Sequence, residues 1–264
     1  MKPLLLLLIL VGVCSPTTIT KAQLIPVAIP PGVAKFIGAT NEFSATAEYR
    51  TETLGHKTNE QGSVEPSIFF SKGNFRTDVD MAEYRNVQYP ASEETKENWR
   101  KYGMAEAVAI YNLASGEVWD IRPKQRGAFG RTLTKDEVEQ VKTWPVPTEI
   151  VMGKETIEGH LCTKSRVTFQ KEDKEPRVSF WELYEWSVEG FVWRADDMNG
   201  FPVQVVWKGQ YYKASLRFKE IKIGNQDATL FTLPSGYTKP NRFQFPGWPG
   251  QREVFSSSGE KTSR

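Results

Sequence analysis

The stretch FSATAEYR, residues 43–50, alternates between apolar or small side chains and polar ones at every position. A repeat of two residues is typical of a β-strand whose sheet has one buried face. The apolar and small side chains that would share this face are Phe43, Ala45, Ala47 and Tyr49. The stretch therefore predicts one strand of an antiparallel sheet with a buried side.

Similar segments follow along the chain, and turn signals separate them every 8–15 residues. They are rich in β-branched and aromatic residues, which favour strands. The predicted strand regions are 65–80 with a turn at 72–74, 107–122 with a turn at 114–116, 156–169, 177–186, 201–207 and 211–223. This series predicts an antiparallel sheet or an open barrel.

Helix signals are few. Ser92 precedes two glutamates and a polar segment that Gly103 would end, and Thr134 begins a capping box that Glu137 completes before Pro145. A mostly antiparallel sheet with two or three helices on one side gives an α+β fold class.

The first 22 residues have the features of a secretory signal peptide. Lys2 precedes an apolar run, Leu4–Val13, which is shorter than the roughly 20 residues of a membrane span, and Ala22 offers a small-residue cleavage site. The alternative is a short membrane anchor. Lipid attachment at Cys14 is disfavoured because Val13 precedes it, where a small residue is required. We expect a periplasmic or secreted protein.

Four regions are predicted. Residues 1–22 form the signal peptide, 23–40 an extended and proline-broken lead-in, 41–238 the folded domain, and 239–264 a flexible tail rich in Pro, Gly and Ser. After cleavage Cys162 is the only cysteine, which excludes an intramolecular disulfide and fits a bacterial periplasm.

Charge is balanced. The chain has 34 basic and 32 acidic residues, and two of the lysines lie in the signal peptide. This composition argues against nucleic acid as a partner.

His160 and Cys162 are the most reactive pair in the sequence. On one strand face they would lie about 6.6 Å apart, too far for the hydrogen bond of a nucleophile and its base. We interpret Cys162 as a buried apolar side chain. His56, His160 and Cys162 are the only strong metal ligands outside the signal peptide, which is too few for a zinc site. We therefore expect no metal. We also find no cofactor-binding or catalytic motif in the sequence.

Carboxylate pairs leave one enzymatic alternative open. Glu182 and Glu185, or Asp196 and Asp197 in a predicted turn, could serve glycoside hydrolysis, although solvated faces and turns carry such residues far more often.

Aromatic residues make up 12% of the chain, and many fall on alternating positions. They form either a large core or the lining of an apolar ligand pocket. The candidate lining residues are Phe43, Tyr49, Trp119, Trp207 and Phe218.

Five short motifs resemble one known group of proteins. They are GNFRTDVD (73–80), AVAIYNLASGEVWDIRP (107–123), GKETIEGHLCTKSRV (153–167), WRADDMNGFPVQV (193–205) and FTLPSGY (231–237). Together they resemble the periplasmic outer-membrane lipoprotein carriers and receptors (LolA/LolB-like), in particular a bacterial branch of unknown function. The resemblance covers residues 40–238. The chain differs from the carriers in its length, its Trp-containing segment 180–186 and its tail.

The resemblance implies a strongly curved antiparallel sheet, an incomplete β-barrel, with helices across its open side. It also implies a concave cavity for acyl chains. We therefore expect a non-enzymatic envelope protein that binds a lipid, an acyl chain or another apolar ligand, with a lipoprotein as one candidate partner. The alternatives are a structural or regulatory protein acting through protein contacts and, third, a hydrolase using a carboxylate or Cys162.

Overall fold

The structure is a computed structural model that describes residues 37, 42–54, 60–112, 115–136, 138–139, 147–168, 189–208 and 212–237. The predicted signal peptide and tail lie outside these residues, as do His56 and the segment 177–186 with its two glutamates. Within the described part of the chain, no helix has the length and apolar character needed to cross a membrane.

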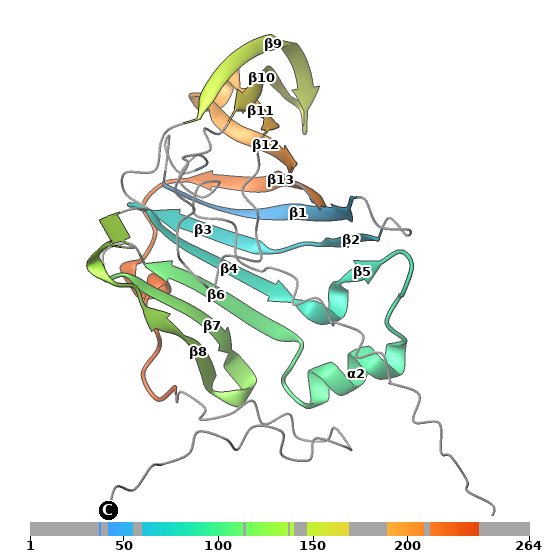
Figure 1. The fold of residues 1–264 in the computed structure, drawn as a ribbon, viewed down its shortest axis with the longest axis vertical. Helices are drawn as coiled ribbons and strands as arrows, with labels where there is room; N and C mark the ends of the chain where they lie inside the picture. Colours follow the sequence, from blue (N-terminus) through green and yellow to red (C-terminus); the bar gives the residue numbers. More distant parts are fainter. Residues whose placement is uncertain are drawn as a thin grey trace, which may run out of the picture.

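Thirteen strands of the described residues form one antiparallel sheet (Figure 1). The main path runs in the order β8-β7-β6-β4-β3-β1-β13-β12-β11-β10-β9, and β2 connects β1 to β5 beside it. The N-terminal strands are β1 (Phe43–Thr53), β2 (Gln61–Val64), β3 (Ser67–Ser71), β4 (Asn74–Asp80), β5 (Arg85–Asn86), β6 (Glu106–Asn112), β7 (Glu117–Arg122) and β8 (Gly127–Thr132). The C-terminal strands are β9 (Thr148–Ile157), β10 (His160–Thr168), β11 (Glu189–Ala195), β12 (Phe201–Lys208) and β13 (Tyr212–Ile223).

Strand β1 lies at the centre of this sheet. One of its edges pairs with β13 from Phe43 to Thr53, and its other edge pairs first with β3 and then with β2. The alternation expected for 43–50 is confirmed, because Phe43, Ala45, Ala47 and Tyr49 are buried while the residues between them are not.

Two hairpins turn on a non-glycine residue followed by glycine. Lys72 and Gly73 have φ values of 51° and 84° and join β3 to β4, which confirms the turn predicted at 72–74. Glu158 and Gly159 have φ values of 49° and 83° and join β9 to β10. Positive φ at both central residues is the conformation of a type I′ turn, a common two-residue hairpin turn. Residues 156–168 are therefore a hairpin tip followed by a strand.

The sheet is curved and stays open. Its register shifts at Ser44/Thr46, Lys164/Ser165 and Trp193/Arg194. Such bulges add local bend and twist. In Figure 1 the strands β9–β12 run at a clear angle to β6–β8 at the other end. The expected curved, incomplete barrel is thus present in its coarse form.

The expectation of two or three helices across the open side is not borne out. Among the described residues the one complete α-helix is α2 (Glu93–Lys101), which Ser92 caps by accepting a hydrogen bond from the Thr95 N–H. None of its residues is buried. Nine residues that include a single apolar one, Trp99, provide no face to pack on a sheet. At the second signal, described residues form only one helical turn, in which Val138 N–H donates to Thr134 O.

The two faces of the sheet differ sharply. We define the inner face by a row of directly opposed residues on β1, β3, β4, β6 and β7: Phe43, Phe70, Phe75, Tyr111 and Val118. These belong to one large buried apolar cluster, the inner cluster.

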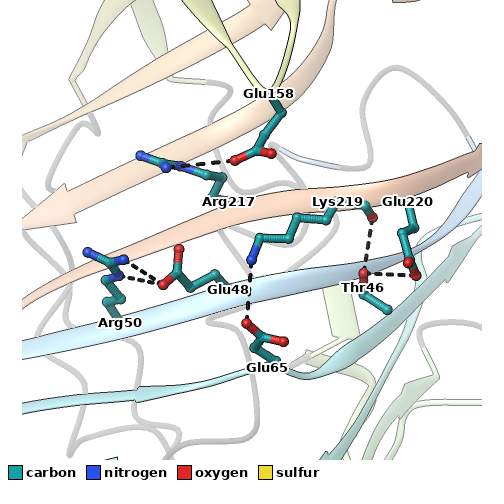
Figure 2. A network of polar contacts seen from close by, with 8 residues as sticks. All are labelled: Thr46, Glu48, Arg50, Glu65, Glu158, Arg217, Lys219 and Glu220. Atoms are coloured by element: carbon teal, nitrogen blue, oxygen red, sulfur yellow. Dashed lines mark hydrogen bonds and ion pairs between the residues drawn. The ribbon is translucent and has the colours of Figure 1, made fainter.

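The outer face of β1 and β13 is charged instead. Figure 2 shows Arg50 bonded to Glu48, Lys219 to Glu65, and Arg217 near Glu158 of the β9–β10 turn. Farther along, the outer face of β6 and β7 bears a smaller apolar cluster, the outer cluster, which includes Phe231 of the 3₁₀ helix η4 (Ala228–Phe231).

Phe43 should be one of the most costly residues to truncate. Its side chain is fully buried, so Phe43→Ala should lower the free energy of unfolding by about 3–5 kcal/mol through lost contacts and a cavity. Ile223 lies opposite Phe43 on β13 and is 48% exposed, so Ile223→Ala should cost less than about 1 kcal/mol. Urea unfolding of both variants measures the difference. Equal losses would contradict the central position of Phe43.

Candidate ligand-binding site

Four of the five predicted lining residues lie in the inner cluster. The ring centroid of Phe43 is 4.9 Å from that of Phe201 and 5.5 Å from that of Phe218, both in edge-to-face arrangements. The rings of Tyr49 and Trp207 are 6.1 Å apart. The sheet therefore gathers residues from β1, β12 and β13 into one aromatic surface.

Trp119 lies elsewhere. It is opposite Ile110 on β6, whereas its neighbour Val118 is opposite the inner-face residue Tyr111. Successive residues of a strand point to opposite faces. Trp119 is consequently part of the outer cluster, on the other side of the sheet from Phe43.

Small residues position Trp207 on the inner face. Its direct neighbours across the sheet are Ala214 on β13 and Gly190 on β11. A Cβ at Gly190 would come within 2.4 Å of the Val206 carbonyl oxygen. Gly190 is therefore required for the close approach of β11 and β12, and the pair of small residues leaves room for the large indole.

Within the described residues, two buried polar atoms of the inner-face strands find no hydrogen-bond partner. They are Trp207 Nε1 and Thr77 Oγ1, on residues that are 1% and 2% exposed. Leaving such a group unsatisfied costs about 1–3 kcal/mol. The sequence reasoning missed Thr77, although its place between Phe75 and Val79 on an alternating strand was a signal that it faces inward.

A charged pair also lies on this face, and it too was missed from sequence. Asp120 follows Val118 by two residues on β7, so their side chains share the inner face, and Arg122 follows Asp120 in the same way. Arg122 Nη1 donates to Asp120 Oδ1 at 2.6 Å. Burial raises the pKa of the Asp120 carboxyl, and the nearby Arg122 guanidinium only partly offsets this. The alternation in VWDIR, residues 118–122, was the sequence signal that Asp120 and Arg122 share a face with Val118.

Cys162 fills space in the core, as predicted. It is fully buried in the inner cluster, and its Sγ donates to the His160 carbonyl oxygen at 3.4 Å. Burial, followed by the carboxylates of Asp197 and Asp196, raises the pKa of the thiol. A buried and protonated thiol is a poor nucleophile.

His160 and the two aspartates connect neighbouring hairpins. His160 Nδ1 lies 2.8 Å from Asp197 Oδ2, and Asp196 accepts hydrogen bonds from Lys154 at 2.6 Å and Thr163 at 2.9 Å. These bonds lower the pKa of Asp196. Both aspartates belong to a 3₁₀ turn, η3 (Asp196–Met198), which confirms the predicted turn. Among the described residues, no group of three His, Cys, Asp or Glu side chains is placed to hold a metal ion.

The buried thiol leads to a direct test. In a Cys14→Ser variant Cys162 is the only cysteine, and iodoacetamide at pH 8 should modify it at least about a hundredfold more slowly in the folded protein than in urea. Because its pKa is raised, the rate should still be increasing above pH 9. Mass spectrometry follows the reaction. Equal rates in the folded and unfolded protein would show that the thiol is accessible.

No protein-family model matches the chain, and no curated protein matches it by sequence. Solved structures do match. A LolA-superfamily protein from Nitrosomonas europaea is 11% identical with a TM-score of 0.32, and the match covers 76% of this chain and 94% of that one. The lipoprotein LppX from Mycobacterium tuberculosis is 10% identical with a TM-score of 0.38, covering 72% and 94%. MucB in its complex with MucA from Pseudomonas aeruginosa is 14% identical with a TM-score of 0.32, covering 75% and 58%. The structural neighbours thus include a member of the superfamily that the sequence resembles. Their sequence identities and TM-scores are too low to assign this chain to a family.

Proposed function

We propose that this protein binds a lipid, or another molecule with an acyl chain, on the inner face of its curved sheet. The observation that carries the proposal is the extent of the inner cluster, which runs from Val118 on β7 through Phe43 on β1 to Trp207 on β12. Among the described residues α2 does not cover it, because α2 has no buried residue, and Phe231 of η4 packs on the outer face. Short helical segments contribute only single side chains, such as Met81 and Met198, to the inner cluster. A large apolar surface on an open sheet is suited to an apolar ligand.

The free energy of transfer from water favours a ligand with a long acyl chain. Each CH₂ group transferred from water contributes about 0.8 kcal/mol. Because the inner-face side chains are already buried, an entering chain must replace apolar contacts that the free protein makes. The driving force then comes from removing the ligand from water, and an amphiphile with oxygen atoms could also satisfy buried polar atoms such as Thr77 Oγ1.

The proposed setting is the cell envelope. Residues 1–22 have the pattern of a secretory signal peptide, which supports export to a periplasm. Transport or sensing of a lipid, or of the acyl chains of a lipoprotein, fits such a location.

A second candidate function, action through protein contacts, is favoured by β9. Within the described residues this strand pairs with β10 alone, and consecutive residues Ile150, Val151 and Met152 are 49%, 67% and 59% exposed. An exposed apolar edge strand can pair with a strand of another chain. The third candidate, a hydrolase, is left with its carboxylate alternative, because Cys162 is fully buried.

Bromine quenching tests lipid binding at the inner face. Bromine atoms on an acyl chain quench tryptophan emission at contact, so 9,10-dibromostearate should reduce the fluorescence of the protein, and unlabelled stearate should reverse this. Trp207→Phe should remove part of the quenched fraction, because Trp207 is one of the two described tryptophans in the inner cluster, the other being Trp193.

Trp119→Phe is the matched control. It removes an indole that is similarly buried but lies in the outer cluster, so quenching should persist. Thermal unfolding establishes that both variants are folded. Absence of quenching in the unmodified protein, or its equal loss in both variants, would overturn lipid binding at this face.

A further inference from the structure

Three inner-face residues lie in line across neighbouring strands. Thr77 on β4 is opposite Ala109 on β6, and Ala109 is opposite Asp120 on β7. Strands are about 4.8 Å apart, so the backbones of Thr77 and Asp120 are separated by roughly 10 Å. Ala109, between them, has the smallest side chain of the three.

The polar groups of this row, together with Arg122, have unused hydrogen-bonding capacity. Thr77 Oγ1 is buried without a partner. Arg122 uses Nη1 for Asp120 and for the Ile121 carbonyl oxygen, which leaves its Nε and Nη2 donors without an acceptor among the described residues. Asp120 accepts through Oδ1, which leaves Oδ2 open.

This row of residues lies between the apolar core and water. Val79, Tyr111 and Val118, which flank Thr77, Ala109 and Asp120 on their own strands, are buried in the inner cluster. In contrast, the side chain of Asp120 is 38% exposed and that of Arg122 is 15% exposed. This is the arrangement required by an amphiphile, with its chain on the apolar side and its head group towards solvent.

The charges select the kind of head group. Asp120 already neutralises Arg122, and the nearby Lys124 is paired with Glu106 at 2.9 Å. An anionic or cationic head group would therefore add an uncompensated charge at a partly buried site, which is unfavourable. A neutral head group with both a hydroxyl and a carbonyl adds none, and it offers a donor for Asp120 and an acceptor for Arg122.

We propose that Thr77, Asp120 and Arg122 form the head-group site for a neutral acyl ester with a free hydroxyl group, of the monoacylglycerol type. One ligand hydroxyl donates to Asp120 Oδ2, the second bonds to Thr77 Oγ1, the ester carbonyl accepts from Arg122, and the acyl chain extends along the inner cluster. This inference rests on the proposed lipid-binding function and adds the ligand class to it.

Three probes with the same C16 chain test the head group. The full chain is titrated with 1-monopalmitoylglycerol, palmitate and methyl palmitate, each competing with a fluorescent fatty acid. The unmodified protein should prefer monopalmitoylglycerol over both others by at least about tenfold, the worth of one hydrogen bond to a charged group. Asp120→Asn leaves the Arg122 charge uncompensated, so the preference should shift towards palmitate by about tenfold.

Asp78→Asn is the matched control. Asp78 is bonded to Arg76 at 2.6 Å, also two residues apart on a strand, with similar exposures of 33% and 19%, but on the outer face. The Asp78→Asn substitution should leave the affinities for all three probes unchanged. Thr77→Val keeps the shape of the buried side chain and should weaken monopalmitoylglycerol alone, which gives a second test if Asp120→Asn does not fold.

The outcomes separate the two proposals. Binding of all three probes with equal affinity, or a preference that neither Asp120→Asn nor Thr77→Val alters, overturns the head-group site and leaves lipid binding standing. If no probe binds the unmodified protein, and dibromostearate does not quench it, both proposals fail.

Discussion

The antiparallel pairing of β1 with β13 is the contact on which the rest of the structure depends. Strands β2–β8 come from residues 61–132 and β9–β13 from residues 148–223, and in the sheet order β1 is the strand between the two groups. Phe43 is opposite Ile223 and Thr53 is opposite Tyr212, so the ladder joins segments far apart in the sequence. Such non-local pairing is costly in chain entropy, and the buried aromatic surface along β1 compensates for it.

The same ladder explains why the inner face is suited to a ligand. Because each strand alternates, the apolar residues of β1 and β13 meet on one side while Glu48, Arg50, Arg217 and Lys219 meet on the other, which is charged. Polar residues interrupt the inner face around Asp120, near the β8 end of the sheet. An apolar surface that ends in a partly exposed polar group is complementary to an amphiphile.

Local features of the fold were predictable from the sequence, and long-range ones were not. The turn at Lys72-Gly73 and the N-cap of α2 at Ser92 depend on a few neighbouring residues, and both were predicted. The helices expected across the open side failed because α2, although correctly located, has no apolar face. The sequence analysis placed Trp119 and Trp207 in one predicted pocket because both lie in alternating segments. Alternation shows which residues of a strand share a face, but it does not show which side of the whole sheet that face belongs to.

The sequence by itself determined several strands and turns and the buried character of Cys162, because these follow from local periodicity and composition. Tertiary structure alone decided which apolar faces coincide. Strand order and register placed Tyr49 beside Trp207, moved Trp119 to the opposite face and aligned Thr77 with Asp120. Register is set by the whole set of pairings, and a shift of one residue would reverse every face, so no single segment contains this information.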